Sequence, residues 1–193
     1  ASRVLLPAGA ALVGAWRLLP SKLPSWWLAK GLSKDRWAQA LFLASNAAYL
    51  LAGSFLTLGA QAELGVLTLC VCGASLLYHA AQCTDGCSSA SAARWCQVDT
   101  ALAVSSGIVF ATRCGVGPEN LALAALSGLF FVDAFSLGYT TTHSLWHVST
   151  AATAVMSVAR LPEATDVLQM RKAAAAAAAG SIKRRVKAKL ARA

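Results

Sequence analysis

Five apolar runs, separated by short polar stretches, dominate the middle of the chain. Each run is close to the ~20 residues that a helix needs to cross the hydrocarbon core of a bilayer. We therefore predict five membrane-spanning helices. They cover about residues 38–58, 64–82, 95–113, 121–138 and 142–159.

The stretches between these runs contain residues typical of turns and helix ends. Segment 83–94 is polar and rich in Ser, Ala and Gly, which predicts a loop outside the membrane. Gly138 is expected in the tight turn before the last span, and the threonines at 140–142 can cap that helix. Asp133 lies inside the fourth predicted span without an obvious partner, and we expect it to bond to a neighbouring helix.

The two ends of the chain depart from this pattern. Residues 1–36 hold a short apolar piece broken by prolines and then a mixture of Trp, Lys and Arg. Such a mixture is typical of the membrane interface and predicts an interfacial arm, with a sixth span as the alternative. After Pro162, an Ala-rich segment leads into a basic tail that is expected to be helical and to bind a lipid surface or an acidic protein. The expected organisation is an arm at 1–36, a helical bundle at 37–160 and a tail at 161–193.

Composition supports a membrane protein. Hydrophobic residues make up 57% of the chain and charged residues 13%, whereas soluble domains carry about 25% charged residues. The formal net charge of +9 comes almost wholly from the two ends, as expected of segments that face lipid headgroups. Nucleic-acid binding by the tail is not favoured. The predicted fold class is therefore an all-α integral membrane bundle of about five transmembrane helices.

Six cysteines give little further information. Cys70 and Cys72 lie in an apolar run, where cysteine behaves mostly as a small hydrophobic residue. Cys83, Cys87 and Cys96 are close in sequence and could form a disulfide on an oxidising side of the membrane. The sequence leaves that question open.

The chain has only three histidines, and the predicted spans bring them to one depth. His143 and His147 are four residues apart, on one face of the last helix. His79 ends the second span, one turn after Ser75, and Asp99 begins the third. Because the third span leaves this side of the membrane and the fourth returns to it, the last helix starts on the same side as His79 and Asp99.

Three imidazoles at one depth suit a zinc site with a fourth position for water, as in catalytic zinc centres. Asp99 could orient that water or accept its proton, and Ser75 could donate a hydrogen bond to an oxyanion. Other interpretations stay open. The histidines could be hydrogen-bonded packing residues or ligands of haem or another metallocofactor. Ser75 could serve helix packing, and Asp99 could be an acid at a helix end.

These residues resemble the CREST superfamily of seven-span membrane proteins, which includes alkaline ceramidases and adipoQ-type receptors, and most closely its myomaker-like branch. The resemblance covers about residues 38–160. The matching pieces are Ser45-Asn46, Ser75-Leu76-Leu77-Tyr78-His79, Asp99 and His143-Ser144-Leu145-Trp146-His147.

The resemblance implies a zinc ion held by His79, His143 and His147, with Asp99 and Ser75 in the active centre. It implies hydrolysis of lipid amides as the activity. The family has three spans between the Asp helix and the final His helix, whereas this chain has room for one. Loss of a pair of helices would leave the three histidine ligands at one depth in the membrane. It would also remove part of the protein that is expected to surround a bound lipid chain.

Two functions follow as hypotheses. The first is a membrane zinc hydrolase that acts on a lipid amide or ester. The second is a structural or accessory subunit of a large photosynthetic or respiratory complex, in which the histidines are structural or ligate the magnesium of chlorophyll or another pigment. A start at Ala1 suggests a removed presequence, so a plastid or mitochondrial membrane is expected, with an endomembrane as the alternative. Membrane lipids and other subunits, contacted through the basic ends, are the expected partners. A receptor of the seven-span type is a weaker third hypothesis.

Overall fold

The computed structural model describes residues 31–59, 61–161 and residue 173. The predicted arm and basic tail therefore lie almost entirely outside the described residues. Within the described ranges all regular structure is α-helical, as predicted. The helices are α3 (Arg36–Ala44), α4 (Ala47–Leu58), α5 (Ala62–Asp85), α6 (Ala90–Cys114), α7 (Pro118–Phe131) and α8 (Tyr139–Ala159).

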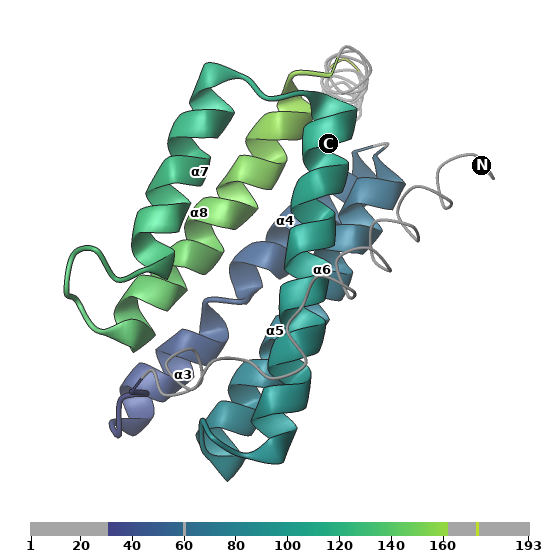
Figure 1. Ribbon diagram of the computed structural model, residues 1–193. Coiled ribbons are helices and arrows are strands. Elements are labelled where there is room, and N and C mark those ends of the chain that lie inside the picture. The colour runs from purple at the N-terminus through teal and green to yellow at the C-terminus, as the bar shows by residue number, and fades with distance from the viewer. Residues whose placement is uncertain (1–30, 60, 162–172, 174–193) are drawn as a thin grey trace, which may run out of the picture.

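The helices form an up-and-down bundle (Figure 1). Most packing is between chain neighbours: α4 with α5, α5 with α6, and α7 with α8. The α7–α8 hairpin joins the rest mainly through α8, which packs on α3 and α4 and touches α6 more sparsely. This order places the C-terminal half of α5 beside the N-terminal half of α8, where the histidines lie.

The first predicted span is interrupted. Ser45 and Asn46 separate α3 from α4, although their backbone stays close to helical. Their side chains compete for main-chain carbonyls, because Ser45 Oγ donates to Phe42 O at 2.6 Å and Asn46 Nδ2 donates to Leu43 O at 3.2 Å. Such local bonds tighten and bend a helix. The bend places Ser45 against α8.

Helices α4 and α5 approach closely at two glycines. A Cβ atom on Gly65 would lie 2.7 Å from the carbonyl oxygen of Gly53 and would also overlap Thr57. A Cβ on Gly53 would lie 2.8 Å from Leu69. Small residues at such positions let helix backbones meet, which is how helices commonly associate within membranes.

The structure corrects the predicted ends of several elements. Most of the predicted loop 83–94 is helical, since α5 continues to Asp85 and α6 starts at Ala90. The fourth predicted span corresponds to helix α7, which ends at Phe131 and not at Gly138. The carboxylate of Asp133 bonds to Leu137 N in the loop, and so not to a neighbouring helix.

The threonines at the start of α8 do not cap it. The N-cap is Gly138, which adopts a positive φ of 85°, and no side chain caps the helix. Thr142 Oγ1 instead donates to Gly138 O at 3.1 Å, and Thr140 Oγ1 accepts from Ser33 N at 3.0 Å. The turn at Gly138 is thus as predicted, whereas the capping is wrong.

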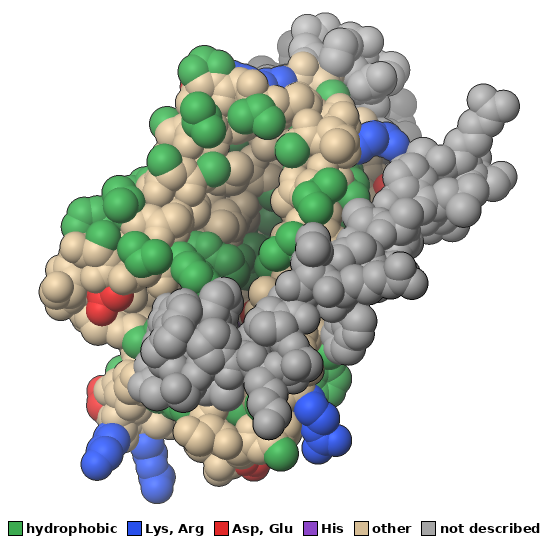
Figure 2. Space-filling view, viewed as in Figure 1, with side chains coloured by type: hydrophobic (Ala, Val, Ile, Leu, Met, Phe, Trp, Pro, Cys, Tyr) green, Lys and Arg blue, Asp and Glu red, His purple; other side chains and the backbone are tan. Residues whose placement is uncertain are grey.

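Many large apolar side chains face outwards, and many small or polar ones face inwards. Leu51 is 71% exposed and Leu41 is 69% exposed, whereas Ser75 and Ser105 are buried. Figure 2 shows apolar side chains distributed over the face formed by α6, α7 and α8. Among the described residues, the segments Arg36–Leu58 and Ala62–Asp85 are long and apolar enough to cross a membrane.

Candidate metal centre

The three histidines meet between α5 and α8. His79 comes from α5, and His143 and His147 come from α8. One ring nitrogen from each lies within 4.8 Å of those of the other two. His79 and His147 have no exposed surface, and His143 is 5% exposed. The predicted convergence is confirmed, and this group can hold a metal ion.

Hydrogen bonds from outside the cluster determine which nitrogen of His147 carries the hydrogen. Ser45 Oγ lies 2.7 Å from His147 Nδ1. The Ser45 hydroxyl already donates its only hydrogen to Phe42 O. It must therefore accept from Nδ1–H of His147, which leaves a lone pair on Nε2.

His79 is held in the same tautomer by a different residue. Its Nδ1 lies 2.7 Å from Gln82 Oε1, and the Gln82 amide is oriented by a bond from its Nε2 to the Tyr78 hydroxyl at 2.9 Å. An amide oxygen only accepts, so Nδ1 of His79 is the donor. Its Nε2 therefore also carries a lone pair.

These two lone pairs face each other. The Nε2 atoms of His79 and His147 are 3.2 Å apart. Two bare ring nitrogens at that distance repel unless a cation lies between them. Four ligands at the usual zinc–nitrogen distance would be about 3.4 Å apart in a tetrahedron. The pair therefore has the separation of two ligands of one ion, and His143 lies beside them as a third.

Ser75 lies at this position too. Its hydroxyl is buried on α5 one turn before His79, and its Oγ is 3.3 Å from His147 Nε2. The Ser75 hydroxyl can donate to that lone pair, or to another acceptor in the same place. The structure thus brings Ser75 beside the histidines.

Asp99 lies in the wall of a cavity that His143 also lines. Its side chain comes from α6 and is 5% exposed. Among the described residues, its Oδ1 has no hydrogen-bond partner. Asp99 and His143 therefore line one internal space, and a carboxylate oxygen is left available within it.

Aromatic rings enclose the cluster. The ring of Phe42 is centred 4.3 Å from that of His79, 5.8 Å from that of His143 and 6.2 Å from that of His147. Tyr139 and Trp146 pack on His143 at 4.9 Å and 4.8 Å. Their packing limits water around the histidines and strengthens electrostatic interactions there.

Three residues at this centre had no role in our sequence analysis. Ser45 entered only as part of the family resemblance, and Gln82 and Phe42 were not singled out. Gln82 could have been found, because a polar residue three positions after His79 shares its helix face. Phe42 had no signal in the sequence, since one phenylalanine in an apolar run is like any other.

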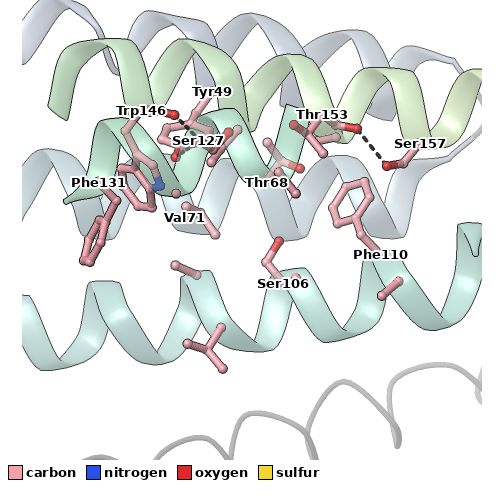
Figure 3. A pocket seen from close by; sticks show the side chains of 18 of the residues that line it. Tyr49, Thr68, Val71, Ser106, Phe110, Ser127, Phe131, Trp146, Thr153 and Ser157 are labelled. Carbon is pink, nitrogen blue, oxygen red and sulfur yellow. Dashed lines mark hydrogen bonds between the residues drawn. The ribbon is translucent and has the colours of Figure 1, made fainter. Parts of the chain in front are cut away.

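The cavity extends from His143 along the bundle and has a volume of about 590 Å³. Figure 3 shows Phe131 and Trp146 at one end, Thr68 and Ser106 in the middle, and Phe110 and Ser157 at the other end. Helix α6 forms one side, and α7 and α8 supply much of the rest. Figure 2 shows the surface hollowed between these elements.

None of the six cysteines, all of which lie in the described part of the chain, takes part in a disulfide bond, so the disulfide considered for Cys83, Cys87 and Cys96 is not formed. Comparisons of the chain with protein-family models, with curated proteins and with solved structures give no match.

Proposed function

We propose that this protein is an integral membrane hydrolase that holds one zinc ion with His79, His143 and His147 and cleaves a lipid amide or ester. The observation that carries the proposal is the approach of two Nε2 atoms to 3.2 Å in a buried site, with both Nδ1 atoms bonded elsewhere, to Ser45 and Gln82. A cation between the two Nε2 atoms would remove the repulsion of their lone pairs, and a long, mostly apolar cavity opens beside His143.

The distribution of side chains supports a position in the membrane. Many leucines and valines are exposed while the histidines and many serines and threonines are buried, which is unusual for a soluble bundle. In lipid the same arrangement is stable, because outward leucines contact acyl chains and inward hydroxyls bond to helix carbonyls. Helices α6 and α8 have 25 and 21 residues, which is the length of a span, but among the described residues only Arg36–Leu58 and Ala62–Asp85 are also apolar enough.

The donor set favours zinc over a pigment. Neutral imidazoles suit zinc and several other transition metals. The three rings are in mutual contact, with centroids 4.8 to 5.0 Å apart, which leaves no space for a macrocycle between them. Three protein ligands leave one coordination position, the arrangement of catalytic zinc sites.

In this proposal, each residue around the cluster has its own role in hydrolysis. A bound zinc ion would supply Lewis acidity for a water molecule and the substrate carbonyl. Asp99 would accept the proton from the attacking water. Ser75 would donate a hydrogen bond to the oxygen on which negative charge develops. The aromatic rings exclude other water, and the cavity binds the acyl chain.

One observation favours a second candidate, a non-catalytic subunit of a larger membrane complex. Helix α7 has 14 residues, or about 21 Å, whereas the hydrocarbon core is about 30 Å thick. The bundle is therefore short on this side, where a helix from another subunit could complete it. In this alternative the histidine site would be structural.

Metal analysis tests the first proposal. The purified full chain is expected to contain about one zinc per chain, and His143→Ala is expected to lose it. Thr141→Ala, an exposed position on the same helix, is the matched control and should retain zinc. Purified wild-type protein that contains no metal, and takes none up from added zinc, would contradict the proposal.

A further inference from the structure

Asn120 is a buried polar residue for which the zinc site provides no role. It lies in the first turn of α7, is 5% exposed and lines the cavity at the end away from the histidines. Among the described residues, neither its Oδ1 nor its Nδ2 has a hydrogen-bond partner. A buried carboxamide with no partner is costly, so such a group calls for a ligand or a bound water.

Several other polar side chains along the cavity are already hydrogen-bonded within the bundle. The hydroxyls of Thr68, Thr153 and Ser157 donate to carbonyls of their own helices at 2.7 to 2.8 Å. Ser127 donates in the same way and also bonds to Ser149. Figure 3 shows Thr153 and Ser157 bonded to one another along α8. These hydroxyl groups thus have hydrogen-bond partners. Neither the oxygen nor the nitrogen of the Asn120 carboxamide has one among the described residues.

The cavity therefore has a hydrogen-bonding group without a partner at the Asn120 end, the histidine site at the other end, and mostly apolar walls between them. The stretch of α7 from Asn120 to Phe131 is about 16 Å long, and Phe131 packs against the ring of His143. Between these ends the walls include Val71, Val104 and Leu121. A ligand that satisfies both ends is a long apolar chain with a polar group at each terminus.

We propose that the Asn120 carboxamide is a second polar subsite, which binds a hydroxyl group at the far end of the lipid chain whose amide lies at the histidines. A hydroxyl suits this residue because it can donate to Oδ1 and accept from Nδ2. The position of the amide rests on the proposed function, but binding at Asn120 does not require the metal. The ligand class is an ω-hydroxyacyl amide.

Binding measurements on zinc-free full chain in detergent test this subsite apart from catalysis. Tritiated palmitoyl ethanolamide is displaced with unlabelled palmitoyl ethanolamide or with its ω-hydroxy analogue. The wild type is expected to bind the hydroxylated probe about tenfold more tightly, the value of one net hydrogen bond. In Asn120→Leu the preference should disappear while the plain probe still binds.

Ser157→Ala is the matched control, because its hydroxyl already donates to Thr153 O and its loss should leave the preference intact. If Asn120→Leu does not fold, Asn120→Ser replaces it and should reduce the preference. Equal affinity of the wild type for both probes, or a preference that survives loss of the carboxamide, would overturn the subsite. A preference that depends on Asn120 in a protein that never binds zinc would support the subsite and contradict the hydrolase.

Discussion

Ser45 and Gln82 determine the chemistry of two histidines without lying between them. Each accepts a hydrogen bond from Nδ1–H of one imidazole: Ser45 from His147, and Gln82 from His79. The Nε2 atom of each ring is thereby oriented toward the position that the histidines share. Partners of this kind orient metal-binding histidines and raise their basicity. At the scale of single residues, the site is therefore set as much by these two side chains as by the histidines.

Replacing Gln82 with Leu should weaken zinc binding by about 10–100-fold, because Nδ1–H of His79 loses its acceptor. Competition with a zinc chelator measures this affinity. Gln39→Leu is the control, since Gln39 is on α3 and donates to Ser33 O. Equal zinc affinity in the wild type and in Gln82→Leu would show that the Gln82 bond does not orient His79.

Asp99→Asn should lower the rate of lipid amide hydrolysis by about 100-fold or more while the bound zinc stays unchanged. Asparagine keeps the shape of the side chain but cannot accept a proton. General base catalysis contributes a factor of about this size to a reaction rate. The measurement is a rate per zinc-loaded chain. Loss of the metal in this variant would instead make Asp99 part of the zinc site, and an unchanged rate would remove it from the reaction.

At the scale of helices, the contact of α4 with α5 depends on glycine. The nearest atoms to a Cβ on Gly65 include the backbone oxygen of Gly53, which cannot rotate away as a side chain can. This contact fixes α5, and with it His79, relative to α4 and to the bend at Ser45. The metal site thus depends on a helix contact some turns away from it.

Gly65→Ala should destabilise the protein by about 1–3 kcal/mol, the usual cost of forcing extra volume into a packed interface. Gly73→Ala on the same helix is a matched control, because no atom lies within 4 Å of a Cβ there. That control should be neutral or more stable by about 0.5–1 kcal/mol, since alanine favours a helix over glycine. Thermal unfolding in detergent compares them, and equal melting temperatures would contradict the close contact.

At the scale of the whole molecule, the bundle has two distinct ends. The histidine cluster is near the turn between α5 and α6, and two ion pairs, Arg113–Glu63 and Arg160–Glu119, are at the other end. Helix α6 connects these ends and is about 37 Å long. If the protein spans a bilayer, these two ends lie on opposite sides of it.

Labelling of single cysteines in a cysteine-free background tests this orientation. Ser88→Cys lies in the turn before α6, and Val116→Cys lies in the turn after it, where Val116 is 67% exposed. In sealed vesicles an impermeant maleimide is expected to label one position and not the other, because in the proposed membrane position α6 would cross the bilayer between them. Both should react after detergent is added. Labelling of both positions in intact vesicles would contradict the spanning bundle.

Much of the arrangement was predictable from the sequence, because the information is local or follows from counting. Apolar runs predicted helices, and the alternating direction of the helices between Asp99 and His143 predicted that the three histidines lie at the same end of the bundle. Helix ends were less predictable, as α7 shows. Asp133 and Ser136 adopt positive φ values in a turn there, and the apolar residues around them gave no indication of it.

The sequence by itself determined that the chain is helical and that its three histidines lie at the same end of the bundle, because periodicity and the alternating direction of successive helices depend only on the chain order. Only the tertiary structure decided that the histidines meet, which nitrogens they present, and that Asn120 ends the same cavity. Those facts depend on contacts between α3, α5, α7 and α8. Contacts between distant segments arise from side-chain shape and the bend of one helix, which no local pattern encodes.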